Sequence, residues 1–229
     1  MTANRFWRLE AHPHGNDFSA AFALKNETIP SIEDGEVLIK VDYLSMDAGT
    51  RMWITPRTDG YQPPLPLQSK MVGLCLGRIT LSRAEGFAPG DFVRCFGQWA
   101  DYAVVTPATS GLTKLDEDIA DLREHFGTLG MNAWTAYAGL VDVAKIQPGE
   151  TVLVSAAAGA TGSLACQIAR NLGCRVIGIA GGPEKCRYLV EELGCDRAID
   201  YKADDVEAEL AKIEGGINAY FDNVGGPIL

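Results

Sequence analysis

A glycine-bearing turn carries the clearest chemistry in this sequence of 229 residues. Residues 156–162 read AAAGATG, after an apolar segment at 151–155 and before a helical pattern. Where a strand turns into a helix, glycine lets a pyrophosphate approach the backbone, and the free N–H groups of the helix start face its charge. Gly159 suits that approach, and Gly162 suits close packing of the helix on the strand. Because Ala156 replaces the first glycine of the usual G-x-G-x-x-G pattern, a tight turn that binds nothing remains the alternative.

The end of the next apolar segment, residues 175–179, bears on which dinucleotide would bind. Enzymes that use NAD place an Asp or Glu about 20 residues further on to hold the ribose 2′-hydroxyl, whereas residues 180–185 here read AGGPEK. Lys185 could pair with a 2′-phosphate, and Arg187 is a second cation nearby. The missing carboxylate favours NADP over NAD, against the alternative of a solvated lysine beside Glu184.

The elements that would position these residues alternate regularly in the second part of the chain. Strands are predicted at residues 151–155, 175–179, 197–200 and 219–222, and helical patterns at 127–146, from the glycine turn to 171, at 184–193 and at 203–213. Strands that alternate with helices predict an α/β domain with a doubly wound parallel sheet. We expect this dinucleotide-binding domain to cover residues 126–229.

The first part of the chain, residues 1–125, shows a different pattern. Short alternating apolar and polar runs, separated by Gly and Pro turns, occur at residues 37–43, 77–81, 91–95 and 102–105. They predict a compact, mostly-β domain. Residues 54–68 contain four prolines and are expected to form a surface loop, of the kind that often borders a site.

Composition excludes several functional classes. With 47% apolar and 22% charged residues and a formal charge of −10, the chain is typical of a globular protein that neither nucleic acid nor an anionic membrane surface would attract. No apolar run approaches the roughly 18 residues of a transmembrane helix, and residues 1–10 carry charges in place of a signal core. The six cysteines form no C-x-x-C pair, so we expect thiols and a cytoplasmic protein.

Further motifs along the whole chain carry a resemblance to a known family. They are IP at 29–30, GEVL at 35–38, YLSMD at 43–47 with Arg51, WxxY at 99–102, GM at 130–131 with TAY at 135–137, the turn at 156–162, Lys185 and FDNVGG at 221–226. The chain resembles the zinc-free medium-chain dehydrogenases/reductases, and within them the group of prostaglandin reductase, leukotriene hydroxydehydrogenase and curcumin (alkenal double-bond) reductase.

The resemblance implies a GroES-like domain at 1–125, a partial Rossmann domain at 126–229, and NADPH-dependent reduction of the carbon–carbon double bond of α,β-unsaturated carbonyls. It implies roles for Gly159, Ala160, Thr161 and Gly162 at the pyrophosphate, Lys185 and Tyr201 at the 2′-phosphate, Met131, Thr135 and Asn223 beside the nicotinamide, and Tyr61 at the substrate. For Tyr61, ordinary packing within its loop is the alternative. No catalytic residue is assigned. A quinone reductase, or a catalytically silent dinucleotide-binding protein, remains an alternative function.

A metal site is not expected. Zinc alcohol dehydrogenases would carry a cysteine near Ser45, Gly-His-Glu near Gly73 and a four-cysteine lobe after residue 90, whereas residues 73–77 here read GLCLG and the lobe is missing. Three zinc ligands of suitable type cannot be assembled from these positions. The three histidines, at positions 12, 14 and 125, are expected to be structural or solvated.

The chain departs from the group's pattern at three places. DAGTR at 47–51 replaces Asp-Pro-Tyr-Met-Arg, which makes the substrate uncertain, and Asn132-Ala133 replaces Pro-Gly. The group's sequences also continue well beyond Leu229. We therefore expect a truncated chain whose fourth parallel strand lies at the sheet edge, and a homodimer for the full-length form.

Overall fold

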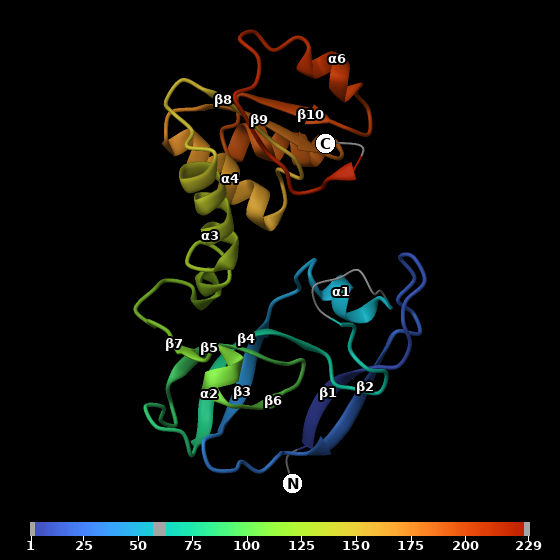
Figure 1. Ribbon diagram of the computed structural model, residues 1–229, viewed down its shortest axis with the longest axis vertical. Coiled ribbons are helices and arrows are strands. Elements are labelled where there is room, and N and C mark those ends of the chain that lie inside the picture. The colour runs from blue at the N-terminus through green and yellow to red at the C-terminus, as the bar shows by residue number, and fades with distance from the viewer. Residues whose placement is uncertain (1–2, 57–62, 227–229) are drawn as a thin grey trace. The chain divides into compact units, whose positions relative to one another are not determined.

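The computed structural model describes residues 3–56 and 63–226, which form two compact units, Met1–Leu122 and Arg123–Leu229 (Figure 1). Tyr61, the candidate substrate residue, lies outside the described residues. None of the helices among the described residues is long and apolar enough to cross a membrane.

The first unit is built almost entirely from antiparallel strands. Its strands are β1 (Ala3–Leu9), β2 (Phe22–Thr28), β3 (Val37–Leu44), β4 (Val72–Ser82), β5 (Phe92–Gln98), β6 (Tyr102–Val105) and β7 (Thr113–Lys114). Strands β1 and β2 pair as a hairpin, and the other five form a sheet in the order β6-β3-β4-β5-β7. Two short helices, α1 (Thr50–Ile54) and α2 (Pro107–Ser110), connect strands. Alternate residues of the sheet, among them Val37, Ile39, Cys75 and Val93, form its buried core, as a two-faced sheet requires.

The second unit contains a parallel four-stranded sheet in the order β10-β9-β8-β11. Its strands are β8 (Thr151–Val154), β9 (Arg175–Ala180), β10 (Arg197–Asp200) and β11 (Ala219–Phe221). A short helical turn at Leu122–His125 lies at the boundary between the two units. The helices of the second unit are α3 (Met131–Tyr137), α4 (Ala160–Asn171), α5 (Pro183–Arg187) and α6 (Val206–Leu210). Wider helical turns continue α3 at Ala138–Val143 and α5 at Tyr188–Glu192.

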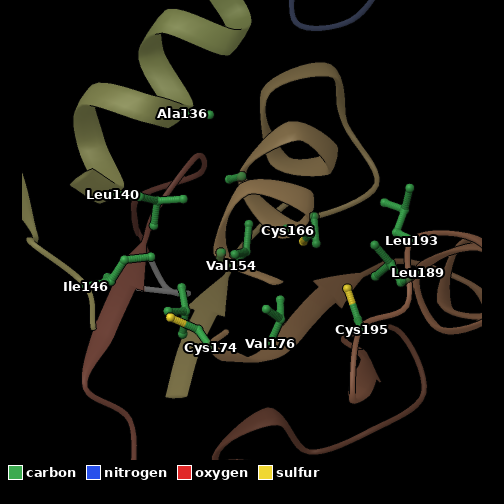
Figure 2. Packing of buried hydrophobic residues seen from close by; sticks show 14 of the residues in the cluster. Ala136, Leu140, Ile146, Val154, Cys166, Cys174, Val176, Leu189, Leu193 and Cys195 are labelled. Atoms are coloured by element: carbon green, nitrogen blue, oxygen red, sulfur yellow. The ribbon is translucent and has the colours of Figure 1, made fainter. Parts of the chain in front are cut away.

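Both faces of this sheet are covered, because successive side chains of a strand point to opposite faces. On one face Val152 and Val154 pack with α3, α4 and the segment after α5, as Figure 2 shows for part of this cluster. On the other face Leu153 and Ile177 pack with Ile213 and residues of α6. Burial on both faces explains why the two inner strands, β8 and β9, are almost continuously apolar, with no alternation.

The predicted fold class is confirmed: a mostly-β GroES-like unit is followed by part of a Rossmann-type sheet. Strand β11 lies at the edge of the described sheet. The helix predicted at 203–213 is shorter than expected and runs only from Val206 to Leu210. Its start is delayed because the Asp205 carboxylate caps it by accepting a hydrogen bond from the Ala208 N–H.

Candidate functional site

The turn after β8 approaches its helix as closely as a dinucleotide-binding turn requires. A Cβ on Gly162 would lie 2.3 Å from the Ala156 carbonyl oxygen and 2.8 Å from the Ala157 Cα, so only glycine fits there. Ala156 has a φ of +44°, in the left-handed region that favours glycine. The backbone at this position therefore has a glycine-like conformation although the residue is alanine.

The first turn of α4 presents unused backbone donors. Gly159 is the N-cap and offers no side chain, and the first amide of this turn with a partner is that of Ser163, which donates to the Gly159 carbonyl. Within residues 3–56 and 63–226, the N–H groups of Ala160, Thr161 and Gly162 have no hydrogen-bond acceptor. These donors, at the positive end of a helix of 12 residues, suit a phosphate group.

Lys185 and Tyr201 follow the ends of the neighbouring strands β9 and β10. Lys185 is exposed in α5, and its side-chain ammonium has no ion pair or hydrogen bond to any residue that the structure describes. The Tyr201 ring lies against the turn after β9, because a Cβ on Gly181 would be 2.7 Å from its Cε1 atom. The two candidates for the 2′-phosphate thus lie beside one turn, and Lys185 is a cation available to an anion.

An acid does stand near this turn, but it comes from β10. The Asp200 carboxylate accepts hydrogen bonds from the backbone N–H of Gly182, at 2.8 Å, and of Lys202, at 3.0 Å. These two donors and the charge of Lys202 lower the pKa of Asp200. Asp200 is therefore engaged in holding the β9 and β10 ends together, which agrees with the lack of an acid at the tip of β9 itself.

Asn223, which follows β11, is hydrogen-bonded to the residue after β8. Its backbone N–H donates to the Ser155 Oγ at 2.8 Å, and its side-chain amide donates to the Ser155 carbonyl at 2.9 Å. Ser155 is fully buried and donates its hydroxyl to Asp222 at 2.6 Å. The Asp222 carboxylate also accepts from the Tyr220 hydroxyl and from the N–H groups of Val224 and Gly225.

The network around Asp222 gives a pH prediction. Its donors, Ser155 first, lower the pKa of Asp222 from an ordinary value of 3.8. A lowered pKa in the folded state means that the carboxylate stabilises the fold above the unfolded pKa and loses this effect as the pH falls through the folded value. We expect the free energy of unfolding of Asp222→Asn to lie below that of the unmodified chain by a constant amount above about pH 5, with the gap closing below about pH 4.

Chemical denaturation at a series of pH values would measure this gap. Asp142→Asn is a matched control, because Asp142 is exposed and its carboxylate has no hydrogen bond or ion pair among the described residues. Its unfolding profile should run parallel to that of the unmodified chain. A gap for Asp222→Asn that stays constant down to about pH 3 would contradict the assigned role.

Two of the three candidates for the nicotinamide side, Met131 and Thr135, lie one turn apart on α3. Met131 is 66% exposed at the helix start, and Thr135 donates its hydroxyl to the Met131 carbonyl at 2.8 Å. Helix α3 lies beside α4 (Figure 1), and Asn132 bridges them by accepting a hydrogen bond from Thr161. The start of α3, the start of α4 and the ends of the four strands thus meet at the carboxyl edge of the sheet, where such folds bind ligands.

Sequence reasoning missed four polar residues of this edge: Asn132, Ser155, Asp200 and Asp222. A usable signal existed for three of them, because Ser155, Asp200 and Asp222 each end a predicted strand, and the ends of parallel strands meet at one edge. Among the described residues, no group of three His, Cys, Asp or Glu side chains could hold a metal ion.

The first unit has a separate pocket of about 330 Å³ beside α1. Its lining includes Phe18, Phe22, Met46 and Trp99, and it is therefore largely apolar. Among the described residues, a Cβ on Gly49, where the group's pattern has an aromatic residue, would meet only the Met52 Cε, at 3.9 Å. Glycine thus leaves open space next to the segment that lines this pocket.

Comparisons with known proteins agree with this architecture. A family model described as an N-terminal domain of oxidoreductase matches residues 5–115, and one described as zinc-binding dehydrogenase matches residues 160–229. The chain is 37% identical to the NADPH-dependent curcumin reductase of Escherichia coli, over 98% of this chain and 65% of that protein. It is 36% identical to mouse prostaglandin reductase 1, over 99% of this chain and 67% of that protein.

The crystal structure of CurA from Vibrio vulnificus in complex with NADPH matches with a TM-score of 0.90 and 37% identity, over 98% of this chain and 66% of that one. The chain belongs to the medium-chain dehydrogenase/reductase family, in the group of the prostaglandin and curcumin reductases. It spans about two thirds of the length of these relatives.

Proposed function

We propose that the whole protein containing this sequence is an NADPH-dependent reductase of the carbon–carbon double bond of α,β-unsaturated carbonyls. The observation that carries the proposal is the start of α4. Among the described residues, the N–H groups of Ala160, Thr161 and Gly162 have no acceptor, and only glycine fits at position 162, where the helix meets the turn. The printed names of the relatives, curcumin reductase and prostaglandin reductase, and the NADPH complex of CurA support the reaction and the cofactor.

Different residues bind different parts of the dinucleotide. Gly159, Ala160, Thr161 and Gly162 bind the pyrophosphate through the helix start, Lys185 and Tyr201 bind the 2′-phosphate, and Met131, Thr135 and Asn223 lie beside the nicotinamide. NADPH, when bound, supplies the hydride that is added to the β-carbon of the substrate. The protein orients the two reactants and excludes water.

For the substrate, we propose that its apolar part occupies the pocket beside α1. The pocket's aromatic and aliphatic lining, with Phe18, Phe22 and Trp99, suits an alkyl or aryl chain. Tyr61 remains our candidate for direct substrate contact from the proline-rich loop. The space left by Gly49 favours substrates that are bulkier near this position than those of relatives with an aromatic residue there.

The decisive experiment follows the loss of NADPH absorbance by the whole protein with a panel of enones, 2-alkenals and quinones. We expect turnover with enones and alkenals and none with saturated carbonyls, because the hydride is added to the double bond. Turnover with quinones only would establish the alternative, a quinone reductase. NADPH binding without any turnover would indicate a catalytically silent dinucleotide-binding protein.

We also infer that the full-length form is a cytoplasmic homodimer that acts on small molecules. The six cysteines of the present sequence, all free thiols, fit a reducing compartment. The dimer is inferred from the family resemblance, and analytical ultracentrifugation of the whole protein would test it.

A further inference from the structure

Asn132 connects two parts of the proposed cofactor site that are far apart in the sequence. Its side-chain Oδ1 accepts a hydrogen bond from the Thr161 hydroxyl at 2.9 Å, and its Nδ2 donates to the Phe126 carbonyl at 3.3 Å. Because a carbonyl oxygen can only accept, the contact with Phe126 fixes which end of the amide faces Thr161. All three residues belong to the second unit.

The two bonded residues hold equivalent places in their helices. Asn132 is the second residue of α3, after the N-cap Gly130, and Thr161 is the second residue of α4, after the N-cap Gly159. Neither N-cap has a side chain that could cap its helix. The hydrogen bond between Asn132 and Thr161 is therefore a direct polar link between the two helix starts.

We propose that Asn132 is a positioning residue for the dinucleotide: through Thr161 it holds the start of α4 in register with the start of α3. Met131 and Thr135 lie on α3, whereas the free N–H donors lie on α4, so the bond sets the spacing between the nicotinamide side and the pyrophosphate side. This assignment rests on the proposed function, since it presumes that both helix starts face one dinucleotide.

The bond also determines how Thr161 can contact a phosphate. A threonine hydroxyl carries a single proton, and Thr161 gives that proton to Asn132. Thr161 therefore contributes its backbone N–H to the phosphate, and Asn132 keeps the residue in the orientation that presents this group. The group's usual proline at position 132 has no side-chain acceptor, so this arrangement distinguishes the present chain from the pattern it resembles.

The expected effect is independent of the cofactor's 2′-phosphate. Pyrophosphate and nicotinamide are common to NADPH and NADH, so loss of the hydrogen bond between Thr161 and Asn132 should weaken the binding of both cofactors by the same factor. A single hydrogen bond of this kind corresponds to about three- to tenfold in the dissociation constant. Lys185, by contrast, would act on NADPH alone, and this difference separates a general positioning effect from selectivity.

Isothermal titration calorimetry of NADPH and NADH tests the proposal with four variants. Asn132→Ala and Thr161→Val each remove one partner, Thr161→Ser keeps the hydroxyl, and the double variant Asn132→Ala/Thr161→Val completes a cycle. Asn171→Ala is a matched control, because Asn171 is exposed at the far end of α4 and its side chain has no hydrogen bond among the described residues. Thermal unfolding of each variant without cofactor records whether it folds.

We expect Asn132→Ala and Thr161→Val each to raise the dissociation constants of both cofactors by about three- to tenfold. The double variant should bind no more weakly than either single variant. Asn171→Ala should bind like the unmodified protein, and Thr161→Ser, which keeps the hydroxyl, should bind both cofactors more tightly than Thr161→Val. Unchanged affinity in Asn132→Ala, additive losses in the double variant, or a loss confined to NADPH would each overturn the proposal. If Asn132→Ala fails to fold, the comparison of Thr161→Val with Thr161→Ser tests the proposal instead. Equal cofactor affinities of these two variants would overturn the proposal.

Failure of the proposed function would look different. In that case the whole unmodified protein, shown to be folded by a cooperative thermal transition, would bind neither NADPH nor NADH, and the role of Asn132 would be overturned with it. If the unmodified chain binds both and only the variants behave against expectation, the proposed function stands and the positioning role is lost.

Discussion

Gly162→Ala is expected to abolish tight dinucleotide binding and to destabilise the second unit. The added Cβ would lie 2.3 Å from the Ala156 carbonyl oxygen and 2.8 Å from the Ala157 Cα, and both are backbone atoms that cannot rotate away. The start of α4 must therefore move off the turn. Overpacking of this kind costs about 1–3 kcal/mol, and the moved helix start no longer presents its N–H groups to the pyrophosphate.

Chemical denaturation and NADPH calorimetry would measure the two effects of Gly162→Ala. Gly127→Ala is a suitable control from the same unit, because its Cβ would meet only Glu124 atoms, at 3.7 Å and beyond. We expect it to change the free energy of unfolding by no more than about 0.5 kcal/mol. If Gly162→Ala retained both full stability and full NADPH affinity, the close approach of α4 to the turn would be wrong.

Lys185→Ala is expected to weaken NADPH binding by about ten- to a hundredfold and to leave NADH binding unchanged. Only NADPH carries the 2′-phosphate, and Lys185 is an exposed cation without an anionic partner among the described residues. Loss of a charge-assisted hydrogen bond therefore affects one cofactor alone. Lys185→Arg should retain part of the preference, because it keeps the charge and changes the geometry.

Side-by-side titration of NADPH and NADH measures this selectivity. Lys212→Ala is the matched control, because Lys212 lies beyond the end of α6 and pairs with Glu209. The preference for NADPH should also fall as the salt concentration rises, because the contact is exposed and screened. Equal losses for both cofactors in Lys185→Ala would assign Lys185 to the shared part of the dinucleotide or to the fold.

The order of elements in the second unit could be predicted from sequence, because buried parallel strands are continuous apolar runs between helical patterns. The predicted strand at 197–200 coincides with β10, and the other three predicted strands differ from β8, β9 and β11 by one residue at an end. The hairpin of β1 and β2 was not predicted. Much of its surface is exposed, so its residues are mixed in polarity and give a weak periodic signal.

Ala156 shows where a motif read as letters misleads. The missing first glycine weakens the match to the nucleotide-binding pattern, yet the residue has a φ of +44°. A left-handed alanine costs about 1–3 kcal/mol, which the surrounding turn and helix must offset. The sequence shows only which residue is present, whereas the backbone conformation depends on what the neighbouring β8, β9 and α4 impose.

The sequence by itself therefore determined the class of fold, the place of the strand-to-helix turn, and the position of a cation, Lys185, after the second strand, because these depend on local spacing. The tertiary structure decided how the edge of the sheet is held together. Three hydrogen bonds there join residues far apart in the sequence: Thr161 and Asn132 are separated by 29 positions, Gly182 and Asp200 by 18, and Ser155 and Asp222 by 67. The ends of parallel strands meet at one edge, but spacing does not predict which partners hydrogen-bond there, since each pair forms only when packing of the whole sheet and its helices brings distant chain segments within hydrogen-bond distance.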